Sequence, residues 1–209
     1  MQQSGVECPF VSRGGLKLFH ALREFGVDVR GLACADFGCS TGGFTDCLLQ
    51  SGAASVVAVD TAYGEFAWKL RNDPRVTLLE RTNALHAKPH RAVELLVADL
   101  GWTRQKHLLP AAAPWLSATG RIITLIKPHY EQEDRRGAGV LSPPQAKEIT
   151  DRVVREIESL GFTVSAVTES PIRGGSKGKS KAAGAGNLEW LALVTPARST
   201  SSPRPDRPD

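Results

Sequence analysis

Asp36-Phe-Gly-Cys-Ser-Thr-Gly-Gly-Phe44 is a run of mostly small residues between two segments of different character. The segment before it, Leu32–Phe37, is short and mostly apolar, which is typical of a buried strand. The segment after it, Thr45–Gln50, is amphipathic and predicts a helix. A glycine-rich turn at such a junction lets the backbone bend sharply and lets a ligand approach it closely. The stretch therefore predicts the first strand–loop–helix unit of an α/β sheet.

Similar apolar segments recur along the chain and predict six more strands. They are Val56–Asp60, Val76–Glu80, Glu94–Asp99, Gly120–Lys127, Phe162–Val167 and Leu188–Val194. Helical spacing of apolar residues predicts helices over residues 14–26 and 144–160, whereas the polar residues 128–143 predict a loop. Strands that alternate with helices favour an open, doubly wound α/β sheet. We therefore expect a Rossmann-like fold with a seven-stranded, mainly parallel sheet and helices on both faces.

The composition is that of one ordinary α/β domain. The chain has 209 residues, 41% of them hydrophobic, and a net charge of +4, which fits an enzyme with or without a nucleic-acid partner. It has no run of about eighteen apolar residues and no leader-like start, so we expect no membrane span and a cytoplasmic location. The four cysteines have neither CxxC nor zinc-site spacing, so we expect reduced, mostly buried thiols and no metal.

The expected organisation is an N-terminal extension (1–10), one domain (11–196) and a disordered tail (197–209). Within the domain, residues 173–187 are rich in Gly, Ala and Ser and predict a flexible loop. The loop has no acid and four basic residues, namely Arg173, Lys177, Lys179 and Lys181. Such a loop either lies along nucleic-acid phosphates or is an ordinary flexible insertion.

Asp60 supports a cofactor-binding role for the glycine-rich loop, because it lies about twenty residues further on at the end of the second predicted strand. An acid there can accept hydrogen bonds from both hydroxyls of an adenosine ribose. A dinucleotide site would need a glycine where this chain has Ser40, and a P-loop would need a Lys after the glycines. We therefore expect a nucleoside cofactor without phosphates, such as S-adenosyl-L-methionine. The loop residues expected to bind it are Asp36, Gly38, Ser40, Gly42, Gly43 and Phe44.

The segment Gly38-Cys-Ser-Thr-Gly42 also has the form G-x-S-x-G of the nucleophile elbow in serine hydrolases. Asp99 and His129 follow Ser40 in the order of a catalytic triad. Such an elbow normally comes after several strands, one of which supplies a loop for the oxyanion, whereas a single predicted strand precedes this one. The hydrolase remains an alternative to the nucleoside site.

Two ionisable residues end neighbouring predicted strands, Asp99 the fourth and Lys127 the fifth. Active sites of open α/β sheets lie at the carboxyl ends of strands, so the two side chains should be adjacent. Methyl transfer to an alcohol needs precise placement and a base. Burial would lower the pKa of Lys127 from about 10.4 toward 7 to 8, giving a neutral base, or its cation would stabilise the forming alkoxide. Taken singly, these residues also fit a snorkelling lysine and a turn acid.

Six runs in one order between residues 11 and 195 indicate a family. They are Val11-Ser-Arg-Gly-Gly-Leu-Lys-Leu18, Ser40-Thr-Gly-Gly-Phe-Thr-Asp-Cys-Leu-Leu-Gln50, Ala67-Trp-Lys-Leu-Arg-Asn-Asp-Pro-Arg-Val76, Glu80-Arg-Thr-Asn83, Leu125-Ile-Lys-Pro128 and Gly186-Asn-Leu-Glu189. Together they closely resemble the haemolysin-A-type ribosomal RNA 2'-O-methyltransferases, a branch of the FtsJ-like group. The resemblance implies a class I methyltransferase domain over 11–196. It also implies S-adenosyl-L-methionine as cofactor and ribosomal RNA or a ribosomal subunit as partner.

The resemblance further implies roles for single residues. The implied catalytic tetrad is Lys17, Asp99, Lys127 and Glu189, with Lys127 acting on the 2'-hydroxyl. The implied cofactor contacts are Gly42, Phe44, Asp60, Asn83 and Asp99. Without the resemblance, Lys17 and Glu189 look like exposed surface residues.

The chain departs from the family in two places. The family usually carries an N-terminal S4-type RNA-binding domain, whereas the match here begins at residue 11. We therefore expect RNA affinity to come from elsewhere, with Arg13 and the basic loop as candidates. After Asp99 the chain reads Leu-Gly-Trp-Thr-Arg-Gln, where the family usually has Val-Ser-Phe-Ile-Ser. Trp102 either stacks on a base or fills a gap.

The leading hypothesis is thus an RNA ribose 2'-O-methyltransferase. A methyltransferase that acts on the oxygen of a small molecule is one alternative. A non-catalytic RNA-binding factor that keeps the cofactor pocket as a relic is another, and the intact tetrad argues against it.

Overall fold

The computed structural model of the chain describes residues 8–132, 140–174 and 186–197. Most of the expected N-terminal extension, the middle of the basic loop and nearly all of the expected tail lie outside these ranges. Seven strands of the described part form one sheet in the order β3-β2-β1-β4-β5-β7-β6, with β7 antiparallel to both of its neighbours. The strands are β1 Ala33–Phe37, β2 Ser55–Val59, β3 Val76–Leu79, β4 Val93–Ala98, β5 Leu116–Ile126, β6 Phe162–Glu169 and β7 Trp190–Pro196. The expected seven-stranded, mainly parallel Rossmann-like sheet is confirmed.

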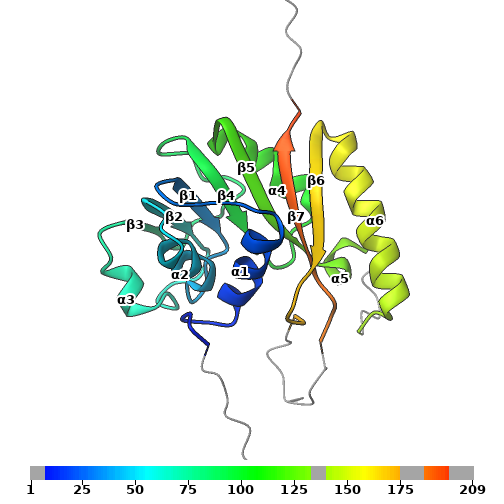
Figure 1. Cartoon of the computed structure of the whole chain (residues 1–209), viewed down its shortest axis with the longest axis horizontal. Helices are drawn as coiled ribbons and strands as arrows, with labels where there is room; N and C mark the ends of the chain where they lie inside the picture. The colour runs from blue at the N-terminus through cyan, green and yellow to red at the C-terminus, as the bar shows by residue number, and fades with distance from the viewer. Residues whose placement is uncertain (1–7, 133–139, 175–185, 198–209) are drawn as a thin grey trace, which may run out of the picture.

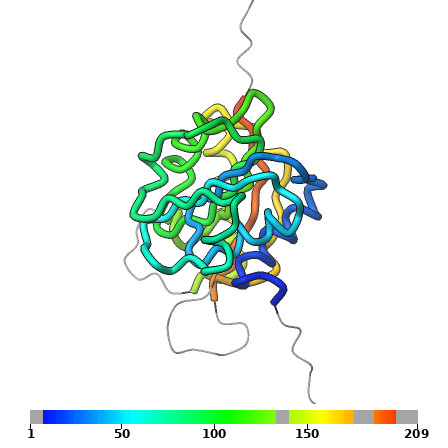
Figure 2. Tube along the Cα trace, turned by 90° about the vertical axis from the view of Figure 1, so that its left-hand side faces the viewer, coloured from blue at the N-terminus to red at the C-terminus, as the bar shows by residue number. Residues whose placement is uncertain are grey.

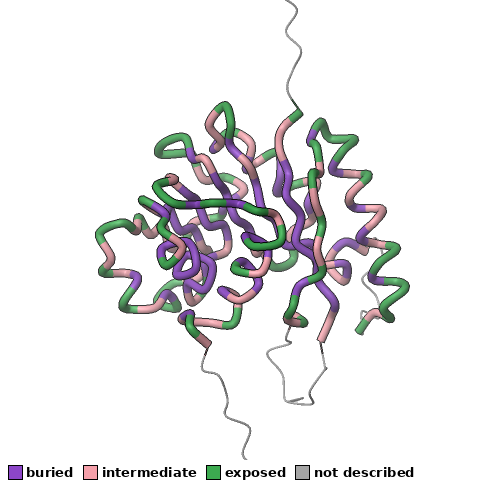
Figure 3. The backbone as a smooth tube through the Cα atoms, viewed as in Figure 1, coloured by how far each residue is buried: buried purple, intermediate pink, exposed green. Residues whose placement is uncertain are grey.

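Helices cover both faces of this sheet (Figure 1). They are α1 Gly14–Glu24, α2 Gly43–Gln50, α3 Trp68–Arg71, α4 Gln105–Ala112, α5 Pro128–Glu131 and α6 Pro143–Ser159, and the short 3-10 helix η1 Ala113–Trp115 follows α4. One apolar cluster packs α1 and α2 against the sheet, and a second packs α4 and α6 against the opposite face. Figure 3 shows the result as mostly buried strands, an almost entirely buried α2, and an α6 in which buried and exposed residues alternate.

The carboxyl ends of the parallel strands share one end of the molecule with the first described residues. The last described residues leave from the opposite end (Figures 1 and 2). The glycine-rich loop and the base of the basic loop both lie at the first end, so the topology gathers the segments with candidate function there. This follows from the parallel pairing of β1 with β2 and β4, and of β4 with β5.

The structure differs from the expected secondary structure at four points. Residues 128–143 are not a loop throughout, because α5 begins directly after Lys127, where the fixed φ of Pro128 suits the first turn of a helix. β5 begins at Leu116 and not at Gly120, and α2 begins at Gly43 and not at Thr45. No helix was expected between β4 and β5, and α4 forms there with Pro110 in its interior.

The cysteines are free thiols in the structure. Cys34, Cys39 and Cys47 are buried and Cys8 is half-buried. Burial raises the pKa of the Cys34 and Cys47 thiols to about 12, which makes them unreactive. In the described part of the chain, no helix has the length and apolar character needed to cross a membrane.

Candidate active site

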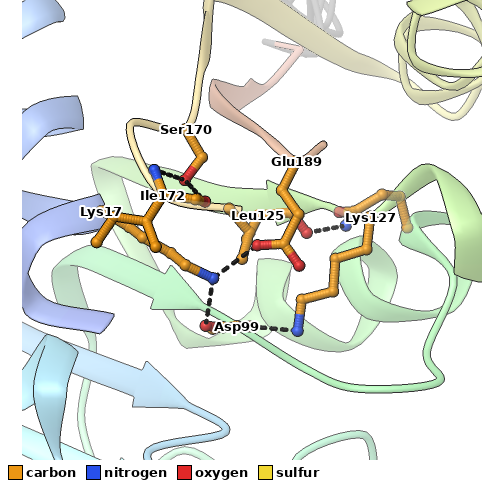
Figure 4. Close-up of polar contacts among 8 residues, drawn as sticks. Lys17, Asp99, Leu125, Lys127, Ser170, Ile172 and Glu189 are labelled. Atoms are coloured by element: carbon orange, nitrogen blue, oxygen red, sulfur yellow. Dashed lines mark hydrogen bonds and ion pairs between the residues drawn. The ribbon is translucent and has the colours of Figure 1, made fainter. Parts of the chain in front are cut away.

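Four ionisable side chains from four segments meet at the carboxyl end of the sheet (Figure 4). Asp99 follows β4 and Lys127 follows β5, and because these strands are parallel neighbours the two side chains form an ion pair. Lys17 reaches the pair from α1, with its Nζ 3.9 Å from Asp99 Oδ2. The same Nζ donates a hydrogen bond to Glu189 Oε2 over 2.6 Å. The four side chains thus form one continuous chain of alternating charge.

The antiparallel strand places Glu189 in this chain. Ile126 of β5 pairs with Trp190 of β7, so Lys127 leaves its strand at the point where Glu189 enters the next one. Gly174 makes room for the carboxylate, because a Cβ at Gly174 would collide with Glu189 Oε1. An isolated bridge between Gly174 and Asn187 holds this close approach.

Burial and neighbouring charges set the protonation of the four groups. Burial alone would raise the pKa of Asp99, but the ammonium groups of Lys127 and Lys17 hold it below its ordinary value. Burial also raises the pKa of the Glu189 carboxyl, against the opposing effect of Lys17. Lys17 and Glu189 are 9% and 3% exposed, so surface statistics describe neither residue correctly.

The sequence argument for a lysine with a lowered pKa was wrong for the free protein. Burial does disfavour the charged amine, but the carboxylate of Asp99 outweighs it and raises the pKa of Lys127 above its ordinary value. Lys127 is therefore an ammonium ion before any ligand binds. Two roles were expected for Lys127. Its ammonium form can stabilise the forming alkoxide, whereas base catalysis requires that it first lose a proton.

The glycine-rich loop is held tightly against its surroundings. Gly38 has φ +82°, and a Cβ there would lie 2.7 Å from the carbonyl oxygen of Asp99. Gly42 has φ +101° and precedes the first residue of α2. A Cβ at Gly43 would collide with Ser12 at the start of α1. The glycines thus let the loop contact β4 and α1 at once, which brings Asp99 and Lys17 close to it.

The other expected cofactor residues lie in different surroundings. Asp60 accepts hydrogen bonds from the backbone N–H groups of Ser40 (2.7 Å) and Ala62 (2.8 Å), one on each carboxylate oxygen. Asp36 is fully buried beneath the loop, accepts a hydrogen bond from the Thr45 hydroxyl, and has a pKa raised by burial to about 7. Asn83 is exposed, and its side-chain oxygen accepts the N–H of Leu85.

A cavity of about 280 Å³ lies beside the charged chain. Its walls come from α1 and its entry, the glycine-rich loop, the end of β4 and the segment after β6. The lining residues are Ser12, Arg13, Gly14, Lys17, Gly38, Cys39, Ser40, Thr41, Gly43, Phe44, Asp99, Ile172 and Arg173. Six predicted site residues that the structure describes do not line it, namely Asp36, Gly42, Asp60, Asn83, Lys127 and Glu189. A smaller crevice shares Cys39 and Ser40 with the cavity and extends to Asp60.

Two of the predicted RNA-binding residues, Arg13 and Arg173, are exposed and line this cavity. The structure therefore brings them together with Lys17 and Asp99. Lys177, Lys179 and Lys181 lie outside the described residues. The contribution of these three lysines stays a prediction.

Sequence reasoning singled out Trp102 but missed Tyr130, which joins it beside Lys127. The Tyr130 ring lies 5.8 Å from Lys127 Nζ, and the rings of Trp102 and Tyr130 are 4.6 Å apart between centroids. His129 packs on Tyr130, and burial together with Lys127 and Lys17 lowers its pKa to about 4. The signal was present in the sequence, because both aromatic segments directly follow strands that end in a candidate catalytic residue.

The hydrolase alternative fails on geometry. Ser40 does have the positive φ (46°) of a sharp turn, but its hydroxyl donates to Glu65 over 3.5 Å and to no histidine. Asp99 pairs with two lysines, and Nδ1 of His129 is buried and has no hydrogen-bond partner among the described residues. Ser40, Asp99 and His129 therefore form no triad.

The donor set fits S-adenosylmethionine. One carboxylate oxygen of Asp60 accepts from Ser40 in the loop and the other from Ala62, and each keeps a second acceptor site for a ribose hydroxyl. The loop itself carries no cation for phosphates, and its glycines leave the cavity open next to Asp99. The fold and the site therefore define an S-adenosylmethionine-dependent methyltransferase of the Rossmann-like class.

Comparisons with known proteins narrow this class. The model of the family described as FtsJ-like methyltransferase matches residues 10–180. The 16S/23S rRNA (cytidine-2'-O)-methyltransferase TlyA of Mycobacterium tuberculosis strain H37Rv is 44% identical over 199 residues, which cover 90% of this chain and 70% of that protein. YqxC of Bacillus subtilis, named as a candidate rRNA methyltransferase, is 36% identical over 87% of this chain and 64% of its own length.

A solved structure agrees with these sequence matches. The structure of a candidate hemolysin from Streptococcus thermophilus superposes with a TM-score of 0.82 at 34% identity, covering 92% of this chain and 69% of that one. The chain belongs to the FtsJ-like methyltransferase family.

Proposed function

We propose that this enzyme transfers a methyl group to a ribose 2'-hydroxyl of ribosomal RNA. The observation that carries the proposal is the unbroken chain Glu189–Lys17–Asp99–Lys127 beside the cavity of about 280 Å³. The names of the two relatives, rRNA (cytidine-2'-O)-methyltransferase and candidate rRNA methyltransferase, support the choice of acceptor.

In this proposal the cofactor lies against the glycine-rich loop, with Asp60 accepting its ribose hydroxyls. When bound, S-adenosylmethionine supplies a methyl group activated by a neighbouring sulfonium charge. Gly43 and Phe44 line the space next to Asp99. In this proposal Asp99 orients the reacting groups. Asp36 lies below the loop and acts through Thr45, so its role is to hold the loop rather than to touch the ligand.

Lys127 is the proposed base for the 2'-hydroxyl. Asp99 keeps it as an ammonium ion in the free protein, so it must lose this proton before it can accept one. As RNA enters and desolvates the site next to a cationic cofactor, the neutral amine is favoured and the ammonium proton would leave to bulk solvent. The amine would then take the hydroxyl proton as the ribose oxygen bonds to the methyl carbon and the bond from that carbon to sulfur breaks. Lys17, held by Glu189, remains available to donate hydrogen bonds to ribose oxygens.

The rim of the cavity supplies contacts for the RNA. Arg13 and Arg173 are exposed there and are suited to bidentate contacts with phosphates. Trp102 is 70% exposed, so it does not fill a gap in the core. Its ring, packed on Tyr130 next to Lys127, is placed to contact the base of the acceptor nucleotide.

The test is the transfer of labelled methyl groups to 16S and 23S rRNA fragments, in parallel with a pool of small metabolites. We expect label in the RNA, at positions that resist alkaline hydrolysis because the 2'-hydroxyl is blocked. Lys127→Ala should abolish transfer, while calorimetry still detects cofactor binding. Lys147→Ala is the matched control, because Lys147 is an exposed lysine paired with Asp151 on α6.

Two results would refute the proposal. Label found only in the metabolites would make the enzyme a small-molecule methyltransferase. RNA binding without turnover in the wild type, under conditions where the cofactor binds, would make it a non-catalytic RNA-binding factor.

A further inference from the structure

An exposed aromatic–arginine pair lies at the same end of the sheet as the active site. The guanidinium carbon of Arg81 is 4.1 Å from the centroid of the Tyr63 ring, and Tyr63 is 66% exposed. Tyr63 follows β2 and Arg81 follows β3, which are parallel neighbours. Their carboxyl ends therefore lie at the edge where β4 and β5 present Asp99 and Lys127.

The two loops that carry this pair are fastened to each other. The backbone N–H of Arg81 donates to the carbonyl of Ala62 over 3.2 Å, and that of Thr82 donates to the carbonyl of Asp60 over 2.9 Å. The N–H of Gly64 donates to the Glu80 carboxylate over 2.7 Å. Three hydrogen bonds therefore connect the loop after β2 to the loop after β3, close to the Tyr63–Arg81 contact.

Glu80 connects these two loops to α3. Its two carboxylate oxygens accept hydrogen bonds from both terminal nitrogens of Arg71 in α3, over 2.7 and 2.9 Å. Glu80 is therefore neutralised by Arg71 and not by Arg81, its neighbour in sequence. Arg81 takes part in no ion pair with the residues that the structure describes.

Arg81 is also held in an unfavourable backbone conformation. Its φ is +52°, which L-residues other than Asn and Asp seldom adopt. Strained residues of this kind persist where the surrounding structure fixes them, and they concentrate at binding sites. In this conformation the guanidinium of Arg81 lies over the Tyr63 ring.

The pair faces outward and not into the cofactor site. Neither Tyr63 nor Arg81 lines the cavity beside Asp99 or the crevice that reaches Asp60. A guanidinium stacked on a ring keeps its N–H edge free for a phosphate, and an exposed ring offers a face to a base. Unpaired RNA nucleotides are recognised by this combination of aromatic face and arginine.

We propose that Tyr63 and Arg81 bind an unpaired nucleotide of the substrate RNA away from the acceptor ribose, with the base on the tyrosine ring and the phosphate on the arginine. The proposal rests on the proposed function for the identity of the ligand. It assigns an RNA contact to the two loops that follow β2 and β3.

The experiment measures the affinity of the full chain for a fluorescein-labelled, single-stranded rRNA fragment at several salt concentrations. Tyr63→Ala should weaken binding by about 5- to 150-fold, the range found for loss of one base–aromatic stack. Tyr63→Phe keeps the ring and should stay within about twofold of the wild type.

Arg81 is tested by a pair of variants that separate charge from strain. Arg81→Asn removes the guanidinium and tolerates the positive φ, so it should reduce the slope of log affinity against log salt by about one. Arg81→Lys keeps a cation and should keep most of that slope. Thermal melting and the cofactor dissociation constant, both unchanged from wild type, show that the variants fold.

The outcomes separate this proposal from the proposed function. If wild type methylates rRNA and Tyr63→Ala leaves RNA affinity unchanged, the stacking site is refuted alone. Weaker cofactor binding at unchanged RNA affinity also refutes it, because the pair would then belong to the cofactor site. If the variants lose RNA affinity but wild type methylates no RNA, the stacking site stands and the proposed function fails.

Discussion

Gly38→Ala tests whether the glycine-rich loop positions the catalytic carboxylate. The new Cβ would lie 2.7 Å from the Asp99 carbonyl oxygen, about 0.7 Å short of the 3.4 Å at which ordinary contacts begin. The backbone of Asp99 must therefore move away from β1 by a distance of this order. Misplacement of a reacting group by about 1 Å can cost on the order of 100-fold in rate. We expect kcat to fall by about 10- to 100-fold.

The same substitution also strains the backbone, because Gly38 has φ +82°. That strain costs about 1–2 kcal/mol and should lower the melting temperature by about 2–8 °C. Gly161→Ala is the matched control, because Gly161 has φ +84° and no atom within 4 Å of the added Cβ. It should show the same loss of stability without the loss of rate.

The assay is single-turnover methyl transfer at saturating cofactor, combined with thermal melting of both variants. Single-turnover conditions exclude product release from the measured rate. If Gly38→Ala and Gly161→Ala lose equal stability and both keep the wild-type rate, the contact between the loop and Asp99 has no catalytic role, and this reasoning is wrong.

Three further predictions concern buried charge. Because Asp99 raises the pKa of Lys127 in the free protein, log kcat/KM should climb by about one per pH unit between about pH 6 and 9, and in Asp99→Asn any residual activity should level off at lower pH than in wild type. Burial raises the pKa of Asp36 from its ordinary value of 3.8 to about 7 in the folded protein, so wild type should lose up to about 4 kcal/mol of stability relative to Asp36→Asn as pH rises from about 4 to 8. Equal pH slopes of the two proteins in urea unfolding would contradict this. Lys17→Met should cost about 3–5 kcal/mol because it leaves Glu189 without its ion-pair partner, and Glu189→Leu should cost less because Lys17 still lies 3.9 Å from Asp99, whereas the double variant should recover most of the stability that Lys17→Met loses and remain inactive.

The strands and the first loop were predictable because their signals are local. Each strand is a short apolar run, and the glycine-rich loop marks itself by composition. The helix α4 was missed because Pro110 interrupts its helical pattern, although tertiary packing of Leu108 and Leu109 against the sheet stabilises it. Local propensity is a weak guide where packing supplies most of the free energy.

The site was predictable in part. Asp99 and Lys127 stand at strand ends, and the rule for open α/β sheets finds such residues directly. Lys17 and Glu189 carry no such signal, because their burial depends on how α1 and β7 pack together; the family resemblance alone indicated them. The exposure of Asn83 and the Tyr63–Arg81 pair depend on loop geometry that no periodicity encodes.

The sign of the Lys127 pKa shift shows why charge cannot be inferred from position alone. The two lysines and two carboxylates alternate in space, so each buried charge faces an opposite one, and burial becomes tolerable only for the set as a whole. A neutral Lys127 in the free protein would leave Asp99 with the more distant Lys17 as its sole cation. The ion pair between Lys127 and Asp99 therefore stabilises the group of charges and also keeps Lys127 protonated. In the proposed function, desolvation of the site by the bound RNA is what shifts Lys127 toward the neutral amine.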